Sequence, residues 1–162
     1  MSSFKIEGGK KLKGSIEPQG AKNEALQILC ATLLTPEEVV IENIPDIRDV
    51  NKLMELLREL GVKIENRGKG IFSFRSDEID LDYLKTKSFE QKAASLRGSI
   101  MILGPLLTRF KKGYIPQPGG DKIGRRRLDT HFTGLQNLGA KFNYDVSNRC
   151  YTIVADKLKG AY

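Results

Sequence analysis

One segment of the chain concentrates residue types that bind phosphate. Residues 116–131 contain three glycines, two prolines and four basic side chains. Gly119 and Gly120 allow backbone conformations closed to other residues, and successive N–H groups in such a turn can form an anion-binding concavity. The arginines at 125–127 add planar groups that suit bidentate contact with phosphate. The segment therefore predicts a phosphate site, and the alternative interpretation is a surface hairpin with scattered charge.

One acidic residue stands among these cations. Asp121 precedes Lys122 and the three arginines. It is either a surface charge that balances its neighbours or an acid whose pKa depends on a bound substrate. The segment lacks the Gly-Lys-Ser/Thr of a Walker A loop and the glycine pattern of a dinucleotide site, so it predicts neither of these.

Two other basic residues lie on apolar helices, and a role in solubility alone does not explain a charge at such a position. Lys22 lies at the start of an apolar helix, shortly after Pro18-Gln19-Gly20, and Arg97 lies within a second one. An arginine on an apolar helix needs an anionic partner or a route to water. Lys22 and Arg97 are therefore candidates for binding an anion, and a route to water is the alternative explanation for Arg97. Many of the other lysines are assigned to solvated faces, for example Lys52, Lys63 and Lys141.

An internal repeat supplies the elements that position these residues. Each copy carries, in the same order, an apolar helix, a Leu-Leu-Thr stretch, a short strand and a Leu-x-x-Leu-Gly-x-Lys stretch. These last stretches cover residues 57–63 and 135–141. A Lys-Leu-Lys-Gly tetrapeptide at 11–14 returns at 157–160, which indicates that the chain ends as another unit begins.

Periodicity and breaker residues predict the secondary structure of each unit. We expect helices over 21–34, 50–60, 88–107 and 127–138, and strands over 39–42, 62–65, 71–74, 114–115, 140–145 and 150–154. Asp49 is predicted to cap the second helix, Ser88 and Gln91 to form a capping box, and Gly61 to end a helix. The unit is therefore β-α-β-α-β-β, used twice over about 21–75 and 88–155. The fold class is α/β of the α+β type, with helices packed on sheets around a shared core.

Composition narrows the classes of function. The chain has 162 residues, 27 Lys and Arg against 20 Asp and Glu, a net charge of +7, 7% aromatic residues and no Trp. The few aromatics and the lack of RNA or DNA motifs argue against nucleic acid as partner. Apolar runs are too short to span a membrane and no secretory signal is evident, so we expect a cytoplasmic protein. One histidine and two cysteines, Cys30 and Cys150, argue against zinc and against a disulfide framework, and both cysteines are expected in the core.

Four motifs in chain order resemble the UDP-N-acetylglucosamine 1-carboxyvinyltransferases, the enolpyruvyl transferases that open bacterial peptidoglycan synthesis. They are Gly20-Ala21-Lys22-Asn23-x-Ala25-Leu26, Leu96-Arg97-Gly98-Ser99-Ile100, Pro118-Gly119-Gly120-Asp121-Lys122-Ile123-Gly124-x-Arg126 and Asp129-x-His131-x-x-Gly134-Leu135-x-x-Leu138-Gly139-Ala140. The resemblance covers the whole chain. It implies the inside-out barrel fold of these transferases, built from repeated βαβαββ units, with about two units present.

The resemblance also implies an organisation beyond this chain. Residues 1–20 would be N-terminal strands that pack with the other domain, and residues 21–162 would be a partial first domain. Family members are more than twice as long, and their C-terminal domain completes the active site. The chain would then be an N-terminal portion that is inactive alone.

The implied reaction joins phosphoenolpyruvate to the 3-hydroxyl of UDP-N-acetylglucosamine and releases phosphate, with no metal or organic cofactor. Lys22 and Asn23 match the motif that holds these two substrates, and Arg97 matches a substrate-binding arginine. The stretch that contacts the nucleotide matches Arg126, Arg127, Leu128, Asp129 and Thr130.

Asp121 matches the proton donor of a mobile loop. Most members carry Cys at that position, so we expect resistance to fosfomycin, which alkylates this thiol. The family's role in cell-wall biogenesis also implies effects on cell shape and division.

Two other functions remain open from the sequence. One is a non-catalytic anion- or RNA-binding module that uses the basic cluster at 111–127. The other is 5-enolpyruvylshikimate-3-phosphate synthase, which shares the repeated architecture and matches these motifs less well. His131 has either a polar role near the substrate or a structural hydrogen bond, and Arg48 is a possible contact in the active-site cleft.

Overall fold

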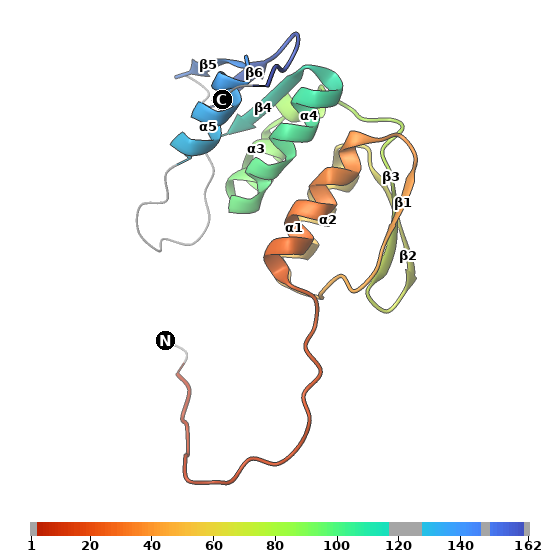
Figure 1. The fold of residues 1–162 in the computed structure, drawn as a ribbon, viewed down its shortest axis with the longest axis vertical. Helices are drawn as coiled ribbons and strands as arrows, with labels where there is room; N and C mark the ends of the chain where they lie inside the picture. Colours follow the sequence, from red (N-terminus) through yellow and green to blue (C-terminus); the bar gives the residue numbers. More distant parts are fainter. Residues whose placement is uncertain (1–2, 117–127, 147–149, 161–162) are drawn as a thin grey trace.

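The computed structural model describes residues 3–116, 128–146 and 150–160. These residues form two three-stranded antiparallel sheets joined by helices. Figure 1 shows one sheet on each side of the molecule, with the helices α1 (Lys22–Ala31), α3 (Lys87–Ala94) and α4 (Leu103–Phe110) between them. The mixed helix-and-sheet class predicted from the sequence is therefore confirmed.

The first unit contains the elements expected for residues 21–75. Helix α1 continues into the 3-10 turn η1 (Thr32–Leu34), and is followed by β1 (Glu38–Ile41) and α2 (Arg48–Glu59). Strands β2 (Lys63–Gly68) and β3 (Ile71–Arg75) complete it, with β3 central in the order β1-β3-β2. The helix and strand predictions for this unit are confirmed within one or two residues of their bounds, except for the extent of β2.

The second unit repeats this order. The short turn η2 (Tyr83–Lys85) leads into α3, η3 (Arg97–Ile102) and α4, followed by β4 (Lys112–Pro116). Helix α5 (Asp129–Asn137) and strands β5 (Lys141–Asp145) and β6 (Cys150–Val154) complete it. The sheet order β4-β6-β5 again places the last strand in the centre.

The ends of α2 and α5 show that the repeat in the sequence is also a repeat in the structure. Gly61 and Gly139 follow these helices with φ of +104° and +101°. The next amide in each copy, at Val62 and Ala140, donates to a carbonyl five residues back at 2.9 Å. This six-to-one hydrogen bond after a left-handed glycine is a Schellman ending, which requires glycine because a Cβ is strained there. Gly61 therefore ends its helix as predicted.

The predicted continuous helix over 88–107 is wrong. Leu96 has extended angles, φ −131° and ψ 110°, and separates α3 from η3. Two local effects favour the break. The Ser99 hydroxyl donates to the Ala93 carbonyl at 2.8 Å and so competes with helical pairing. The break also places Arg97 at the start of η3 rather than inside a buried helix, where its charge would lack water.

Two predicted caps are also wrong. Helix α3 begins earlier than the Ser88–Gln91 capping box requires, and its cap is Thr86, whose hydroxyl accepts from the Phe89 amide at 3.2 Å. Helix α2 begins at Arg48, so the residue predicted as its cap, Asp49, lies inside the first turn. The Asp49 carboxylate pairs with a lysine instead of with its own backbone.

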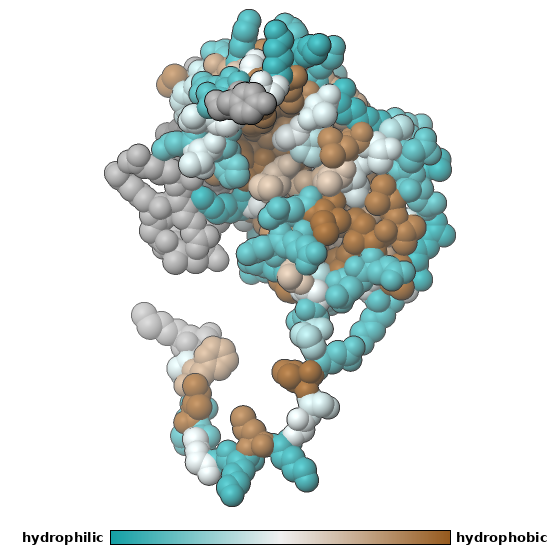
Figure 2. Space-filling model, in the orientation of Figure 1, coloured by the Kyte–Doolittle hydropathy of each residue, from teal (hydrophilic) through white to brown (hydrophobic). Residues whose placement is uncertain are grey.

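Residues 3–20 contain neither helix nor strand and run away from the body of the molecule as an extended arm (Figure 1). Four of the apolar side chains on this arm, Phe4, Ile6, Leu12 and Ile16, are exposed. Figure 2 shows hydrophobic residues at intervals along the arm, away from the body of the molecule. Each unit therefore shows α-β-α-β-β within the described residues, without the leading strand of the expected βαβαββ. That residues 1–20 form strands against another domain stays a prediction.

Two apolar clusters hold the units together. The larger joins α1, α2, α3 and the first sheet, and the smaller lies between α4, α5 and the second sheet. Met101 packs against both clusters. The Arg109 guanidinium also links the units, because it donates to the carbonyls of Leu33 and Ser76 at 3.1 and 2.7 Å. Among the described helices, none is long and apolar enough to cross a membrane.

Candidate functional site

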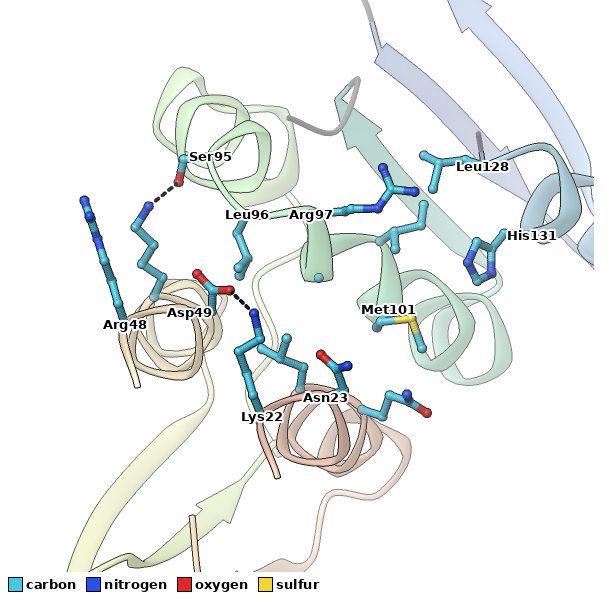
Figure 3. Close-up of a pocket in the computed structure, with 15 residues that line it drawn as sticks. Lys22, Asn23, Arg48, Asp49, Ser95, Leu96, Arg97, Met101, Leu128 and His131 are labelled. Carbon is cyan, nitrogen blue, oxygen red and sulfur yellow. Dashed lines mark hydrogen bonds and ion pairs between the residues drawn. The ribbon is translucent and has the colours of Figure 1, made fainter. Parts of the chain in front are cut away.

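A cleft of about 690 Å³ opens where the N-terminal ends of α1, α2, η3 and α5 meet (Figure 3). Each of these elements contributes side chains from its first turns, and the end of α3 contributes another. The lining residues are Lys22, Asn23, Leu26, Gln27, Arg48, Asp49, Lys52, Ser95, Leu96, Arg97, Gly98, Ile100, Met101, Leu128 and His131. The cleft therefore lies between the two units and depends on both.

The four helix starts around the cleft share an unusual feature. Their N-cap positions hold Ala21, Ile47, Leu96 and Leu128, whose side chains carry no atom that accepts a hydrogen bond. The first backbone N–H groups of a helix have no intrahelical partner and carry partial positive charge. Where capping side chains are absent, these groups are available to an anion. Their convergence adds partial positive charge at the cleft to that of its basic side chains.

Four basic side chains add to this field. Lys22 and Arg48 begin α1 and α2, Lys52 follows one turn later on α2, and Arg97 begins η3. Asp49 is the only carboxylate among the described residues that line the cleft, and its Oδ2 lies 2.9 Å from Lys22 Nζ. Figure 3 shows this pair on one wall, with Arg97, Leu128 and His131 on the other. The balance of charge favours a ligand that carries phosphate or carboxylate groups.

Four of the residues predicted to bind substrate lie in this cleft. Lys22, Asn23, Arg97 and Leu128 come from three different elements and line it together. Asp129 and Thr130 are exposed on the first turn of α5 and are not among the lining residues. Asp121, Arg126 and Arg127 lie outside the described residues. The roles assigned to all of these residues stay predictions.

Several lining residues escaped the sequence interpretation. Lys52 was assigned to a solvated face, but its Nζ lies 3.5 Å from Ser95 Oγ at the rim of the cleft. Arg48 precedes it by one turn, as Asn23 precedes Gln27 on α1. Positions four apart share a helix face. A polar residue four positions after a candidate cleft residue, as Lys52 follows Arg48 and Gln27 follows Asn23, could therefore have been predicted to line the cleft. His131 also lines the cleft, which favours the polar role.

The cysteines lie in the core as expected. Cys30 is 1% exposed on α1, and burial raises the pKa of its thiol to about 12. Cys150 is also buried, and its Sγ donates to Tyr114 Oη at 2.7 Å. Neither cysteine lines the cleft at the helix starts. Across the described residues, no group of three or more His, Cys, Asp or Glu is placed to hold a metal ion.

Three curated relatives of this chain carry the same name. The chain is 59% identical over 162 residues to the UDP-N-acetylglucosamine 1-carboxyvinyltransferase of Bacteroides thetaiotaomicron. It is 53% identical to the enzyme of that name from Porphyromonas gingivalis and 43% identical to the one from Borreliella burgdorferi. The alignments cover 99–100% of the chain. The chain spans 36–37% of the length of these relatives.

Solved structures show the same fold at low identity. The enolpyruvyl transferase NikO from Streptomyces tendae matches 94% of this chain and 32% of its own, with a TM-score of 0.67 and 20% identity. An EPSP synthase from Acinetobacter baumannii matches 94% of this chain and 34% of its own, with a TM-score of 0.53 and 14% identity. These likenesses confirm the enolpyruvyl transferase fold predicted from the motifs. The family model described as EPSP synthase (3-phosphoshikimate 1-carboxyvinyltransferase) matches residues 6–161, and the chain belongs to this family of enolpyruvyl transferases.

Proposed function

We propose that this chain forms part of an enzyme that transfers the enolpyruvyl group of phosphoenolpyruvate to the 3-hydroxyl of UDP-N-acetylglucosamine. The observation that carries the proposal is the cleft where four helix starts without capping side chains meet four basic residues. Both substrates carry phosphate groups, and phosphoenolpyruvate carries a carboxylate as well. The name shared by relatives of up to 59% identity selects these substrates among the anions that the cleft suits.

The cleft residues would act through charge and position. Lys22 and Arg97 neutralise the phosphate and carboxylate groups as charge moves during addition and elimination, and they cost no reorganisation if already in place. The Asn23 amide can both donate to and accept from a sugar hydroxyl or acetamido group. Leu128, Asp129 and Thr130, with Arg126 and Arg127, would contact the nucleotide.

Asp121 is proposed as the proton donor to the phosphoenolpyruvate methylene. In the addition step the sugar oxygen bonds to carbon 2 while the methylene takes a proton, and in the elimination step phosphate leaves and a proton is lost. A carboxylic acid can supply that proton, but it lacks a thiolate for fosfomycin to alkylate. The full-length enzyme should therefore keep its activity after incubation with fosfomycin and show no covalent adduct. Labelling with loss of activity would contradict this assignment.

We infer that the rest of the enzyme completes the site. The chain spans about a third of the length of its relatives, so the base that accepts the sugar hydroxyl proton would come from elsewhere. Closure of a second domain would also exclude water. The chain alone should bind substrate weakly and catalyse nothing. The activity would place the enzyme in the cytoplasm at the first committed step of peptidoglycan synthesis, with consequences for cell shape and division.

A second candidate acceptor is shikimate 3-phosphate. Both the family model and one of the solved structures carry the EPSP synthase name. The identity to that structure is 14%, against 59% for the sugar-nucleotide enzyme, so the first proposal is favoured.

Substrate binding and phosphate release test the proposal. Isothermal titration of the chain with UDP-N-acetylglucosamine and with shikimate 3-phosphate should show binding of the sugar nucleotide only. Arg97→Gln should weaken it by about tenfold or more, since hydrogen bonds to charged groups contribute about 1.5–3 kcal/mol. Lys63→Gln, which removes a charge from β2, is the control.

Phosphate release by an enzyme of the relatives' length, incubated with phosphoenolpyruvate and each acceptor, should require the sugar nucleotide. Release with shikimate 3-phosphate would favour the second candidate. RNA binding that persists at moderate salt, with no binding of either acceptor, would favour the non-catalytic module, because phosphate contacts weaken steeply with salt.

A further inference from the structure

A polar stripe runs along α2 away from the cleft. Its residues are spaced three or four apart, so they lie on one face of the helix. Its four members contact three neighbours: Asp49 binds Lys22, Lys52 approaches Ser95, and Glu55 and Glu59 both bind Lys92. The stripe therefore connects the start of α1, in the cleft, with the body of α3, outside it.

Lys92 of α3 binds the part of this stripe that lies farthest from the cleft. Its Nζ lies 2.6 Å from Glu55 Oε1 and 2.5 Å from Glu59 Oε1. The other oxygen of Glu59 accepts from the hydroxyls of Tyr83 and Ser88. The side chains of Lys92 and Glu59 are 32% and 35% exposed, so water reaches this cluster only in part.

The charges of this cluster reinforce one another. Hydrogen bonds from Lys92 and Tyr83 lower the pKa of Glu59, and those to Glu55 and Glu59 raise the pKa of Lys92. Glu59 and Lys92 are therefore both charged at neutral pH. One ammonium group that bridges two carboxylates on successive turns fixes α3 along α2 more tightly than a single exposed pair does.

Short connections lead from Lys92 to the cleft. The Ser95 hydroxyl donates to the Lys92 carbonyl at 2.9 Å, and the chain then turns at Leu96 into Arg97. On the far side of Arg97, the buried hydroxyl of Ser99 donates to the Ala93 carbonyl at 2.8 Å. The backbone of Arg97 is thus held from both sides by the last turn of α3.

Helix α3 is short, and one face of it is buried. It contains eight residues, of which Phe89 and Ala93 are buried. A shift of the helix along α2 would move the turn that carries Arg97. The bridge from Lys92 to α2 opposes that movement.

We propose that Lys92 is a positioning residue, which holds Arg97 in the cleft by fastening the last turn of α3 to α2. Lys92 itself does not line the cleft, so it acts through the backbone of residues 95–99. The inference rests on the proposed function in so far as Arg97 binds substrate. It adds a residue that neither the motifs nor the cleft identify.

Amide hydrogen exchange of the whole chain, without ligand, tests the positioning directly. Lys92→Met should speed exchange at Ser95, Leu96 and Ser99, whose amides donate within this turn. The expected factor is about threefold to tenfold, with α1 unchanged. Lys92→Arg should stay near the wild-type rates, because a guanidinium can also bridge two carboxylates.

Lys85→Met is the matched control. Lys85 lies 2.7 Å from Asp82, three residues away in the chain, and its loss removes the same charge without touching α2. Glu55→Gln and Glu59→Gln each remove one arm of the bridge and replace Lys92→Met if that variant does not fold. Exchange in Lys92→Met equal to that in Lys85→Met, or faster exchange throughout α1 and α2, would overturn the proposal.

Titration with UDP-N-acetylglucosamine gives the functional readout. Lys92→Met should bind about threefold to tenfold more weakly than Lys85→Met, and this difference should vanish when both carry Arg97→Gln. An equal loss in the Arg97→Gln background would contradict an effect through Arg97. If the wild-type chain binds no sugar nucleotide, the proposed function fails, and the exchange experiment alone decides the positioning of Arg97.

Discussion

Lys22 Nζ and Asp49 Oδ2 lie 2.9 Å apart and join the first turns of α1 and α2 across 27 residues of sequence. Both side chains are about half-exposed, so the pair contributes little to stability. Its position matters more, because it fixes one cation of the cleft between two helix starts. A phosphate that enters the cleft meets a lysine already held in place.

Lys22→Ala should therefore weaken binding far more than it weakens the fold. We expect about a tenfold or greater loss of affinity for UDP-N-acetylglucosamine, from the loss of one charge-assisted contact. The free energy of unfolding should change by less than about 1 kcal/mol. Titration calorimetry and urea unfolding measure the two effects. Lys63→Ala, which removes a paired lysine of β2, should leave the affinity nearly unchanged.

The charge cluster between α2 and α3 should make stability depend on acid pH. The pKa of Glu59 is lowered from 4.5, chiefly by its hydrogen bond from Lys92. A lowered pKa stabilises the fold above the unfolded value, and this contribution is lost as the pH falls through the folded value. The free energy of unfolding of wild type should exceed that of Glu59→Gln by less than about 1 kcal/mol at pH 7, and this gap should close below pH 4.5.

Urea unfolding at pH 7 and at pH 3.5 to 4 measures this gap. Glu37→Gln, at an exposed glutamate before β1, is the control and should show no comparable pH dependence. A gap between wild type and Glu59→Gln that stays constant with pH would show that packing, rather than charge, accounts for it.

Burial of Cys30 predicts a loss of stability at alkaline pH. Its thiol has a pKa of about 12 in the fold against an ordinary value of 9.0. The raised pKa means that stability is complete below pH 9 and is lost as the pH rises toward 12, because the unfolded thiol ionises first. Between these pH values, the free energy of unfolding of wild type should fall by up to about 1.4 kcal/mol per pH unit more than that of Cys30→Ala.

Urea unfolding of reduced protein between pH 8 and 10.5 tests this difference. The other ionisable groups are common to both proteins, so their effects on the free energy of unfolding cancel in the comparison. Equal slopes would contradict the burial of Cys30. The native thiol should also resist a disulfide reagent at pH 8 until denaturant is added.

The two glycines that end α2 and α5 should respond unequally to substitution. Both have positive φ, so alanine at either position should cost about 1–2 kcal/mol. A Cβ at Gly61 would also lie 2.2 Å from the Glu78 carbonyl oxygen, whereas at Gly139 it would lie 3.4 Å from that of Lys157. Gly61→Ala should therefore be the more destabilising change.

Gly104→Ala is the control for these substitutions. Nothing lies within 4 Å of its added Cβ and the residue is helical, so alanine should be neutral or stabilise by up to about 1 kcal/mol. Thermal or urea unfolding of the three variants gives the ranking. If Gly139→Ala cost as much as Gly61→Ala, backbone strain alone would explain both.

Most of the secondary structure could be predicted because its causes are local. The apolar stripe on α2, the glycine after it and the short β-branched strands are visible within a dozen residues. The failures share one physical reason. The break at Leu96 depends on Ser99 and on the cost of burying Arg97, and Asp49 leaves its capping role for a partner 27 residues away. Short-range propensity contains neither effect.

The sequence by itself determined the repeat, the glycine positions that end its helices, and the motifs that identify the family. It also marked Lys22 and Arg97, because a charge on an apolar helix demands an explanation. Only the tertiary structure decided that four helix starts converge, that Arg48, Lys52 and His131 join the same cleft, and that Lys92 ties α3 to α2. These relationships depend on how the two units pack, and packing brings together residues that no local pattern connects.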